Sequence, residues 1–547
     1  MKHTEKTNFI TGAAMLAAAN LVCKVLGVLF RVYAIRIMGE DGMFYYEKVY
    51  PIYSWLLIIS SSGIPIAISR MVAARVARGM YEEADKLFKK AFWMLFALGV
   101  ATTAFMIVLS QPIAVYVLDS HDEGMRWALC ALAPALFFTS LLCAYRGYLQ
   151  GLQRMEGTSL SQLAEQIFKM LFGLSLAWYL FRRYSNTPFA AAAGSVGVLL
   201  GVTISEALAL AVIYPIFRKE RSVMLTGFDP SNPAEEEKHI LKGLLAIAIP
   251  ITLGASILPI ANVLDSAMIT RLLIHSGYPE PEADWMYVVL CSYVRSIINL
   301  PAGISTSLSM AVVPAISASV ARRETEDTKK LSAMSVKLAM AIGLPCAVGL
   351  SVLARPAIFL LYRHIQPESL DLASSLMHIA AFTVVFISLS QTVTGALQGV
   401  GRHRLPVYFL ALGGLTKVIV NIVYVSNPRI GIYGAVFSNL ACYGVAAILD
   451  TIALVVVTKG KLPFLDTFLK PALASALMGG AAWGVYHLLG MVLDMRRYLF
   501  STAACILAII VAIVFYLVLV LRLRVFTKDE LTRIPGGKRL IRYAKQE

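Results

Sequence analysis

Long apolar runs recur along the whole chain and are separated by short polar segments. A helix needs about 20 mostly apolar residues to cross a hydrocarbon layer about 30 Å thick, because each residue rises about 1.5 Å. The runs meet that length, and the pattern therefore predicts an all-α polytopic membrane protein. Fourteen transmembrane helices are predicted, at 9–36, 49–74, 91–113, 126–150, 158–181, 188–216, 240–264, 285–317, 333–354, 371–399, 405–426, 430–457, 467–492 and 498–521.

Composition agrees with this pattern. Of the 547 residues, 58% are hydrophobic and only 15% are charged, and the mean hydropathy is +0.70. Such values exclude a set of soluble domains. The first apolar run is longer than a signal-peptide core and is expected to stay as a helix.

The net charge of +16 follows the predicted topology. Lys and Arg gather in the N-terminal tail, in the loops after even-numbered helices and in the C-terminal tail. Because cytoplasmic loops carry the excess of basic residues, both termini are predicted to face the cytoplasm. The basic residues form no patch with interleaved aromatics, so we expect phospholipid headgroups and no nucleic acid as partners.

The chain contains an internal repeat. GYLQGLQR (Gly147–Arg154) is echoed by GALQGVGR (Gly395–Arg402), 248 residues later, and Lys169 and Lys417 follow at the same spacing. Helices 1–6 and 7–12 are therefore predicted to be two copies in the same orientation, with a substrate path at their interface. The predicted divisions are an N-lobe (1–217), a cytoplasmic linker (218–239), a C-lobe (240–460), helices 13 and 14 (461–522) and a basic cytoplasmic tail (523–547).

Ionisable residues inside predicted spans are the candidate functional residues. Such a side chain costs about 2.5 to 3.5 kcal/mol on insertion scales, so it usually faces a cavity or a partner. The cations are Lys24, Arg31, Lys169, Arg295 and Lys417, and the acids are Glu165, Glu206, Asp265 and Asp450.

The cations on the first helix are the leading candidates. Lys24 and Arg31 are seven residues apart and therefore share one helix face. They and Arg295 have no acid one turn away, and we expect them to line a cavity or to meet a partner on another helix. A cavity with guanidinium and ammonium groups suits a pyrophosphate, because Arg binds phosphate oxygens in pairs and Lys acts as a point charge.

The other candidates have a structural alternative. Glu165 and Lys169 are four residues apart, the spacing of an ion pair within one helix. Lys417 has Asn421 one turn further along. We assign Lys169 and Lys417 to substrate binding and Glu165 and Asn421 to a supporting role.

Two acids and two prolines complete the assignment. Asp265 and Asp450 lie near predicted helix ends, where we expect them to reach water. Proline inside a span frees backbone groups and allows bending. Pro65 and Pro301 are the predicted hinges.

Motifs for catalysis and cofactors are absent from the sequence. It has no GxxxxGK[ST] phosphate loop, HExxH or GxSxG, and no CxxC or clustered histidines. We therefore expect no catalytic residues, no metal and no cofactor. The chain is predicted to be a transporter that draws on ion or substrate gradients and not an enzyme.

Four segments carry a resemblance to a known family: KVLGVLFR (Lys24–Arg31), GIPIAISRMVAARVARG (Gly63–Gly79), YRGYLQGLQRMEGTSLSQLAEQIFK (Tyr145–Lys169) and PITLGASILPIANVLDSAMITRLL (Pro250–Leu273). They resemble the polysaccharide-transport branch of the multidrug/oligosaccharidyl-lipid/polysaccharide exporter superfamily. Within it the chain is most similar to stage V sporulation protein B and MurJ-type lipid II flippases.

The resemblance implies two six-helix lobes and a final helix pair beside a lipid groove. It also implies that basic residues of helices 1 and 8, here Lys24, Arg31 and Arg295, hold the pyrophosphate of a lipid-linked anionic glycan. The expected function is to flip an undecaprenyl-pyrophosphate sugar, lipid II, across the cytoplasmic membrane by alternating access, for peptidoglycan synthesis or sporulation and with cell-wall synthesis proteins as partners. Alternatives are another lipid-linked polysaccharide unit, a cation-coupled multidrug antiporter, and a membrane-embedded glycan polymerase, for which the outer loops are too short.

Overall fold

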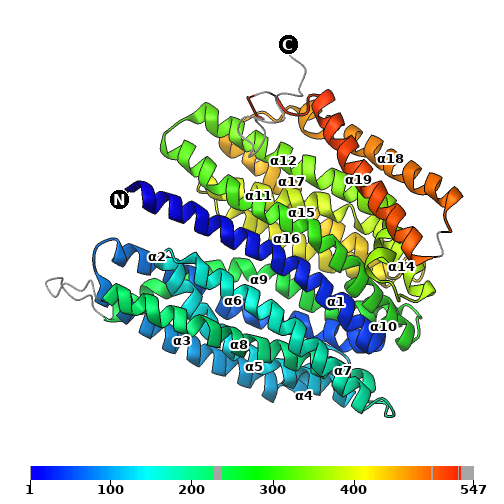
Figure 1. The fold of residues 1–547 in the computed structure, drawn as a ribbon, viewed down its shortest axis with the longest axis horizontal. Helices are drawn as coiled ribbons and strands as arrows, with labels where there is room; N and C mark the ends of the chain where they lie inside the picture. Colours follow the sequence, from blue (N-terminus) through cyan, green and yellow to red (C-terminus); the bar gives the residue numbers. More distant parts are fainter. Residues whose placement is uncertain (1, 226–236, 495–496, 528, 531–547) are drawn as a thin grey trace. The chain divides into compact units, whose positions relative to one another are not determined.

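The computed structural model describes residues 2–225, 237–494, 497–527 and 529–530 (Figure 1). These residues are helical apart from short turns and include no β-strand. Ten described helices are long and apolar enough to cross a membrane, or eleven when one bent pair is counted as a single span. The predicted all-α polytopic membrane fold is therefore confirmed.

Helices run through all fourteen predicted ranges. The first two ranges fall on α1 (Lys2–Ser61) and α2 (Gly63–Val76), and the fifth falls on α6 (Met155–Phe168) and α7 (Leu174–Arg183). These helices are not among the ten that meet the length and apolarity criteria. The count of fourteen spans therefore stays a prediction.

The predicted loop between the first two ranges is itself helical. α1 continues through it and is broken only at Gly39, whose φ of 72° and ψ of −175° are not helical. Glycine reaches positive φ without the steric cost that a Cβ imposes. One residue thus turns the chain where the sequence pattern indicated a polar loop.

The chain divides into two compact units, 1–271 and 272–547, and the first is built around α5. α5 (Glu123–Gly151) packs on α1, α2, α3 and α8, and many of its buried residues are alanine or glycine, which lets the helices approach closely. After α1 and α2 the helices of this unit are α3 (Tyr81–Val108), α4 (Ser110–Pro112), η1 (Ile113–Val117), α5, α6, η2 (Lys169–Gly173), α7, α8 (Ala190–Leu225) and α9 (Glu237–His275), which ends just past the boundary.

The second unit is built around α15 (Thr383–Gly399), which packs on α11, α12 and α17. α18 and α19 pair with each other and share an apolar cluster that includes Ala474, Ala508 and Tyr516. The remaining elements are α10 (Glu280–Val288), η3 (Val289–Arg295), α11 (Ser296–Ala321), α12 (Thr325–Val352), α13 (Ala354–Leu361), α14 (Pro367–Ala380), α16 (Leu405–Val420), η4 (Asn421–Val425), α17 (Tyr433–Thr458), η5 (Leu465–Leu469), α18 (Lys470–Val492) and α19 (Tyr498–Arg522).

The repeated sequence motif marks the same structural feature in both units. α5 ends at Gly151 and α15 ends at Gly399, 248 residues apart. Two residues further on, Gln153 and Gly401 both have positive φ, 62° and 87°. The left-handed residue ends the helix and starts the turn to the next one.

The glycines of the motif also make corresponding contacts. A Cβ at Gly151 would meet Val72 of α2, and a Cβ at Gly399 would meet Ile316 of α11. Val72 and Ile316 are 244 residues apart, the offset at which VAR (Val76–Arg78) recurs as VAR (Val320–Arg322). Each central helix therefore approaches its neighbour at corresponding positions. The internal repeat is thus visible within each unit.

Several predicted features fall at structural boundaries. Pro65 lies in the first turn of α2, three residues after the break at Ser62, and Pro301 lies within α11; their role as hinges stays a prediction. Half of the predicted linker, 226–236, and most of the predicted tail, 528 and 531–547, lie outside the described residues.

Candidate functional site

Lys24 and Arg31 differ in their surroundings on α1. Lys24 is exposed and makes no hydrogen bond or ion pair with any described residue. Arg31 donates from Nη1 to Glu47 Oε1 at 2.7 Å, and its guanidinium lies 5.6 Å from the ring centre of Tyr46. Arg31 therefore meets an acidic partner, as the alternative interpretation allowed, while 23% of its side chain stays exposed.

The contact between Arg31 and Glu47 depends on the break in α1. In a straight helix, residues 16 positions apart are about 24 Å apart along the axis. The chain turns at Gly39, and the two halves of α1 therefore come together. Sequence spacing alone pointed to neighbours one turn away and missed Glu47.

Lys169 lies against aromatic rings and not against Glu165. Its Nζ is 4.8 Å from the ring centre of Phe30 and 5.3 Å from that of Tyr50, within cation–π range. Tyr50 stacks on Tyr46, 5.0 Å between centres, so a pair of tyrosines connects Lys169 to Arg31. The structure thus brings Arg31 and Lys169 to one polar and aromatic cluster on the second half of α1.

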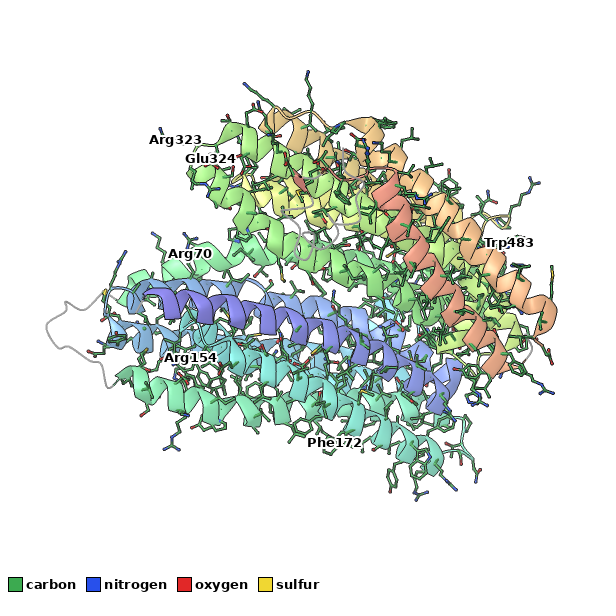
Figure 2. All side chains as sticks on the ribbon, turned by 45° about the horizontal axis from the view of Figure 1, so that its top comes forward. Arg70, Arg154, Phe172, Arg323, Glu324 and Trp483 are labelled. Atoms are coloured by element: carbon green, nitrogen blue, oxygen red, sulfur yellow. The ribbon has the colours of Figure 1, made fainter. Side chains whose placement is uncertain are left out.

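The intrahelical pair between Glu165 and Lys169, the structural alternative for these two residues, does not form. Arg146 Nη2 of α5 donates to Glu165 Oε2 at 2.9 Å. The π-helix η2 begins at Lys169, which widens the turn at that point. Phe172, labelled in Figure 2, belongs to the same π-helical turn.

Arg146 is a charged site residue that the sequence reasoning missed. It lies inside the fourth predicted range, 126–150, directly before the repeated motif, and is absent from the charged residues named above as candidates inside spans. Its Nε also donates to Ser161 Oγ at 2.9 Å, so the guanidinium joins α5 to α6. Glu165 could have indicated this residue, because an acid inside a predicted span needs a cation from another helix.

Glu206 is another acid of this unit, and it forms no ion pair with a described residue. It is buried on α8, and its Oε2 has no hydrogen-bond partner among the described residues. It interacts electrostatically with Glu165, Arg146 and Lys169. The interior of this unit therefore contains acidic as well as basic side chains. The cationic surface predicted from the sequence is limited to Lys24, which is exposed, and Arg31, which is partly exposed.

The second unit holds the other candidates. Arg295 ends the π-helix η3 and is partly exposed, and Pro301 follows in α11. Lys417 and Asn421 are buried one turn apart, where α16 passes into η4. η2 and η4 thus both lie beside a lysine of the repeat.

The two acids expected to reach water are buried. Asp265 on α9 and Asp450 on α17 are each only 1% exposed. Both positions lie within helices packed by neighbours, and the short aspartate side chain does not reach the surface from there. The expectation of snorkelling is therefore wrong for both.

A comparison with protein families identifies the chain. The profile of the family described as "Polysaccharide biosynthesis protein" matches residues 9–320, more than half of the sequence. The chain belongs to the polysaccharide biosynthesis protein family. The profile described as MatE also matches, over 290–423.

Three curated relatives of this chain come from Bacillus subtilis (strain 168). The uncharacterized membrane protein YabM is 26% identical over 98% of this chain and 96% of its own length. Stage V sporulation protein B is 23% identical over 98% and 99% of the two chains. The lipid II flippase MurJ is 22% identical over 76% and 77%. The resemblance stated from the four segments is confirmed.

Solved structures show the same fold for this family member. An inward closed structure of the lipid II flippase MurJ has a TM-score of 0.66 at 15% identity, over 93% of this chain and 99% of that one. An inward-facing multidrug resistance MATE family transporter of the MOP superfamily has a TM-score of 0.63 at 16% identity, over 81% and 99%. The polysaccharide biosynthesis protein described here is therefore a multi-pass membrane protein with the fold of that superfamily.

Proposed function

We propose that this protein is a flippase that moves an undecaprenyl-pyrophosphate-linked sugar, lipid II, from the inner to the outer leaflet of the cytoplasmic membrane by alternating access. Relatives named as lipid II flippases support the substrate class: MurJ of Bacillus subtilis at 22% identity and a probable lipid II flippase of Bdellovibrio bacteriovorus at 24%. The observation that carries the proposal is Lys24, an exposed cation on a membrane helix without a partner among the described residues.

An exposed cation within a membrane span is stabilised by an anion that can bind and leave. An ammonium group within a span costs about 2.5 to 3.5 kcal/mol, and a bound phosphate relieves that cost. Arg31 lies two turns further along α1, and 23% of its side chain is exposed. Lys24 therefore contacts one phosphate as a point charge, and Arg31 is the second proposed contact to the pyrophosphate.

The three other cations have less direct roles in this conformation. Arg295 belongs to the second unit and is partly exposed, and it is proposed as a further substrate-binding residue. Lys169 and Lys417 are buried, so they act on the substrate through their electrostatic field or contact it after a conformational rearrangement. Glu165 and Asn421 have a supporting role beside these lysines. The lipid tail stays in the bilayer while Pro65 and Pro301 take up the bending.

The same proposal fixes the cellular setting. Both termini face the cytoplasm, as the distribution of basic residues requires under the positive-inside rule. Delivery of lipid II places the protein in peptidoglycan synthesis, in growth or in sporulation, beside cell-wall synthesis proteins. No nucleic acid and no cofactor takes part.

Complementation of a strain depleted of its flippase tests the proposal, with the outward exposure of lipid II as the readout. We expect rescue by the wild type and failure of Lys24→Ala, Arg31→Ala and Arg295→Ala at equal membrane levels. Lys24→Arg keeps the charge and should rescue, and Lys89→Ala, which removes an exposed lysine that pairs with Asp85 at one end of α3, is the matched control. Rescue by Lys24→Ala would contradict the site, and no rescue by the wild type would contradict the substrate.

A second candidate substrate is another lipid-linked polysaccharide unit. The family profile that matches more than half of the chain is described by polysaccharide biosynthesis and not by peptidoglycan. Restored surface polysaccharide in a strain that lacks an oligosaccharide flippase, without lipid II exposure, would favour this candidate.

A further inference from the structure

The second unit buries a carboxylate that has no compensating cation among the described residues. Asp450 lies on α17, and both hydrogen bonds to it come from hydroxyl groups of α15. Ser390 Oγ and Thr394 Oγ1 donate to Asp450 Oδ2 at 3.2 and 3.4 Å. Asp450 Oδ1 has no hydrogen-bond partner among the described residues.

No charged side chain faces Asp450 from the described elements that pack on α17. These elements are α12, α14, α15, α16 and η4, and the interactions of Asp450 are confined to burial, Ser390 and Thr394. Lys337 of α12 pairs with Glu530, and Lys417 of α16 does not pair with Asp450. The carboxylate therefore faces neutral groups only.

The depth of Asp450 makes an ionised state expensive. It lies eight residues before the end of α17 at Thr458, which is about 12 Å along the helix axis. A carboxylate taken out of water without a cation costs several kcal/mol even after relaxation. Such a group is neutralised by binding a cation or a proton.

The internal repeat shows what the first unit does at the same place. Arg146 precedes Gly147 and Thr394 precedes Gly395, so the two residues occupy corresponding positions. Arg146 holds its acid, Glu165, by a 2.9 Å ion pair, whereas Thr394 offers Asp450 only a hydroxyl. The first unit therefore has a cation at this position, which pairs with Glu165, and the second unit has an uncharged threonine there.

The bond lengths indicate which mobile charge replaces it. A hydroxyl that donates to an ionised carboxylate usually lies at about 2.5 to 2.7 Å, and both contacts to Asp450 Oδ2 are longer. A metal ion would need several oxygen ligands, and the hydroxyls of Ser390 and Thr394 are the only described groups that hydrogen-bond to Asp450. A proton needs one carboxyl oxygen.

We propose that Asp450, with Ser390 and Thr394, is a proton-binding site of the second unit, occupied in this conformation and emptied when a conformational change exposes it to water. The site supplies the coupling ion for the flippase, and this role in transport rests on the function proposed above. Proton binding itself is independent of the substrate. The proton moves reversibly between water and Asp450, and no covalent bond to carbon changes.

Modification by dicyclohexylcarbodiimide tests proton binding on the purified full-length wild type in liposomes, because this apolar reagent reacts with protonated carboxyl groups. Peptide mass spectrometry is used to measure the labelled fraction of Asp450 and Glu165 between about pH 5 and pH 9. We expect labelling of Asp450 that falls about tenfold per pH unit once proton loss begins, and little labelling of Glu165, whose Oε2 accepts a hydrogen bond from Arg146. Unlabelled Asp450 at low pH, or labelling that does not change with pH, would overturn the site.

Two further arms separate the alternatives. Protection of Asp450 by sodium chloride but not by potassium chloride at one pH would assign the site to sodium and overturn the proton. In liposomes with a pH gradient, Asp450→Asn should reduce the rate of gradient-driven lipid II flipping at least about tenfold. Ser390→Ala should keep most of this rate. Normal gradient-driven flipping by Asp450→Asn would overturn the coupling role, whereas labelling without any flipping by the wild type would contradict only the proposed substrate.

Discussion

Gly201 on α8 is where a single methyl group should disturb the candidate site most directly. A Cβ at this position would lie 2.2 Å from Gly173 Cα and 2.3 Å from Gly173 N, at the end of η2. Non-bonded carbon atoms prefer about 3.5 to 4.0 Å, so Gly201→Ala requires α8 and η2 to separate by about 1.5 Å. The atoms in contact are backbone, and no side chain can turn away.

The displacement should lower stability and disturb the position of Lys169. Overpacking of this kind costs about 1 to 3 kcal/mol, against about 1 kcal/mol that alanine gains over glycine in a helix. We expect a lower apparent Tm of the detergent-solubilised protein. Because η2 begins at Lys169, lipid II flipping by the variant should fall as well.

Gly480 on α18 is the matched control. A Cβ there meets nothing within 4 Å, and the neighbouring Trp483 is exposed on the same helix (Figure 2). Gly480→Ala should therefore keep activity and raise the apparent Tm slightly through helix propensity. Equal stability and equal flipping of Gly201→Ala and Gly480→Ala would refute the close approach of α8 and η2.

Two ion pairs give further predictions. Lys337 is buried and meets both carboxylate oxygens of Glu530, at 3.0 and 2.9 Å, so Glu530→Gln leaves an uncompensated cation and should cost about 3 kcal/mol in detergent unfolding; a loss no larger than that of Glu326→Gln, in an exposed pair, would contradict this. Arg146→Met should destabilise by a similar amount because it strands Glu165, and adding Glu165→Gln should restore most of the stability; a double variant as unstable as the single one would show that the guanidinium packs and does not pair.

The fold followed from the sequence because length and apolarity decide which segments enter a bilayer. All fourteen predicted ranges are helical, and the repeat found in the motif after α5 reappears as a shared helix end and shared glycine contacts. The predicted loop between the first two ranges was wrong, because this polar stretch is helical. Gly39 supplies the turn within one residue, and a polarity pattern averaged over several residues does not resolve it.

The site was harder to predict because pairing between helices depends on tertiary contacts. Spacing rules place Lys169 near Glu165, but they do not reveal that Arg146 approaches from α5. They also cannot show that a kink brings Glu47 to Arg31. The types of charged residue were readable from the sequence, and their partners were not.

The two repeats have the same framework but differ in how they neutralise a buried acid, and this difference fits directed transport. A pyrophosphate bound by Lys24 and Arg31 neutralises charge that the empty first unit would otherwise expose to the bilayer. In the second unit, a proton on Asp450 neutralises the buried carboxylate. On the proposed mechanism, Lys24 and Arg31 respond to the bound substrate, and Asp450 responds to the pH gradient. The free-energy cost of a conformational change is low only when the charges of both sites are neutralised. Replacing Thr394 with arginine should therefore hold Asp450 ionised and make flipping independent of the pH gradient.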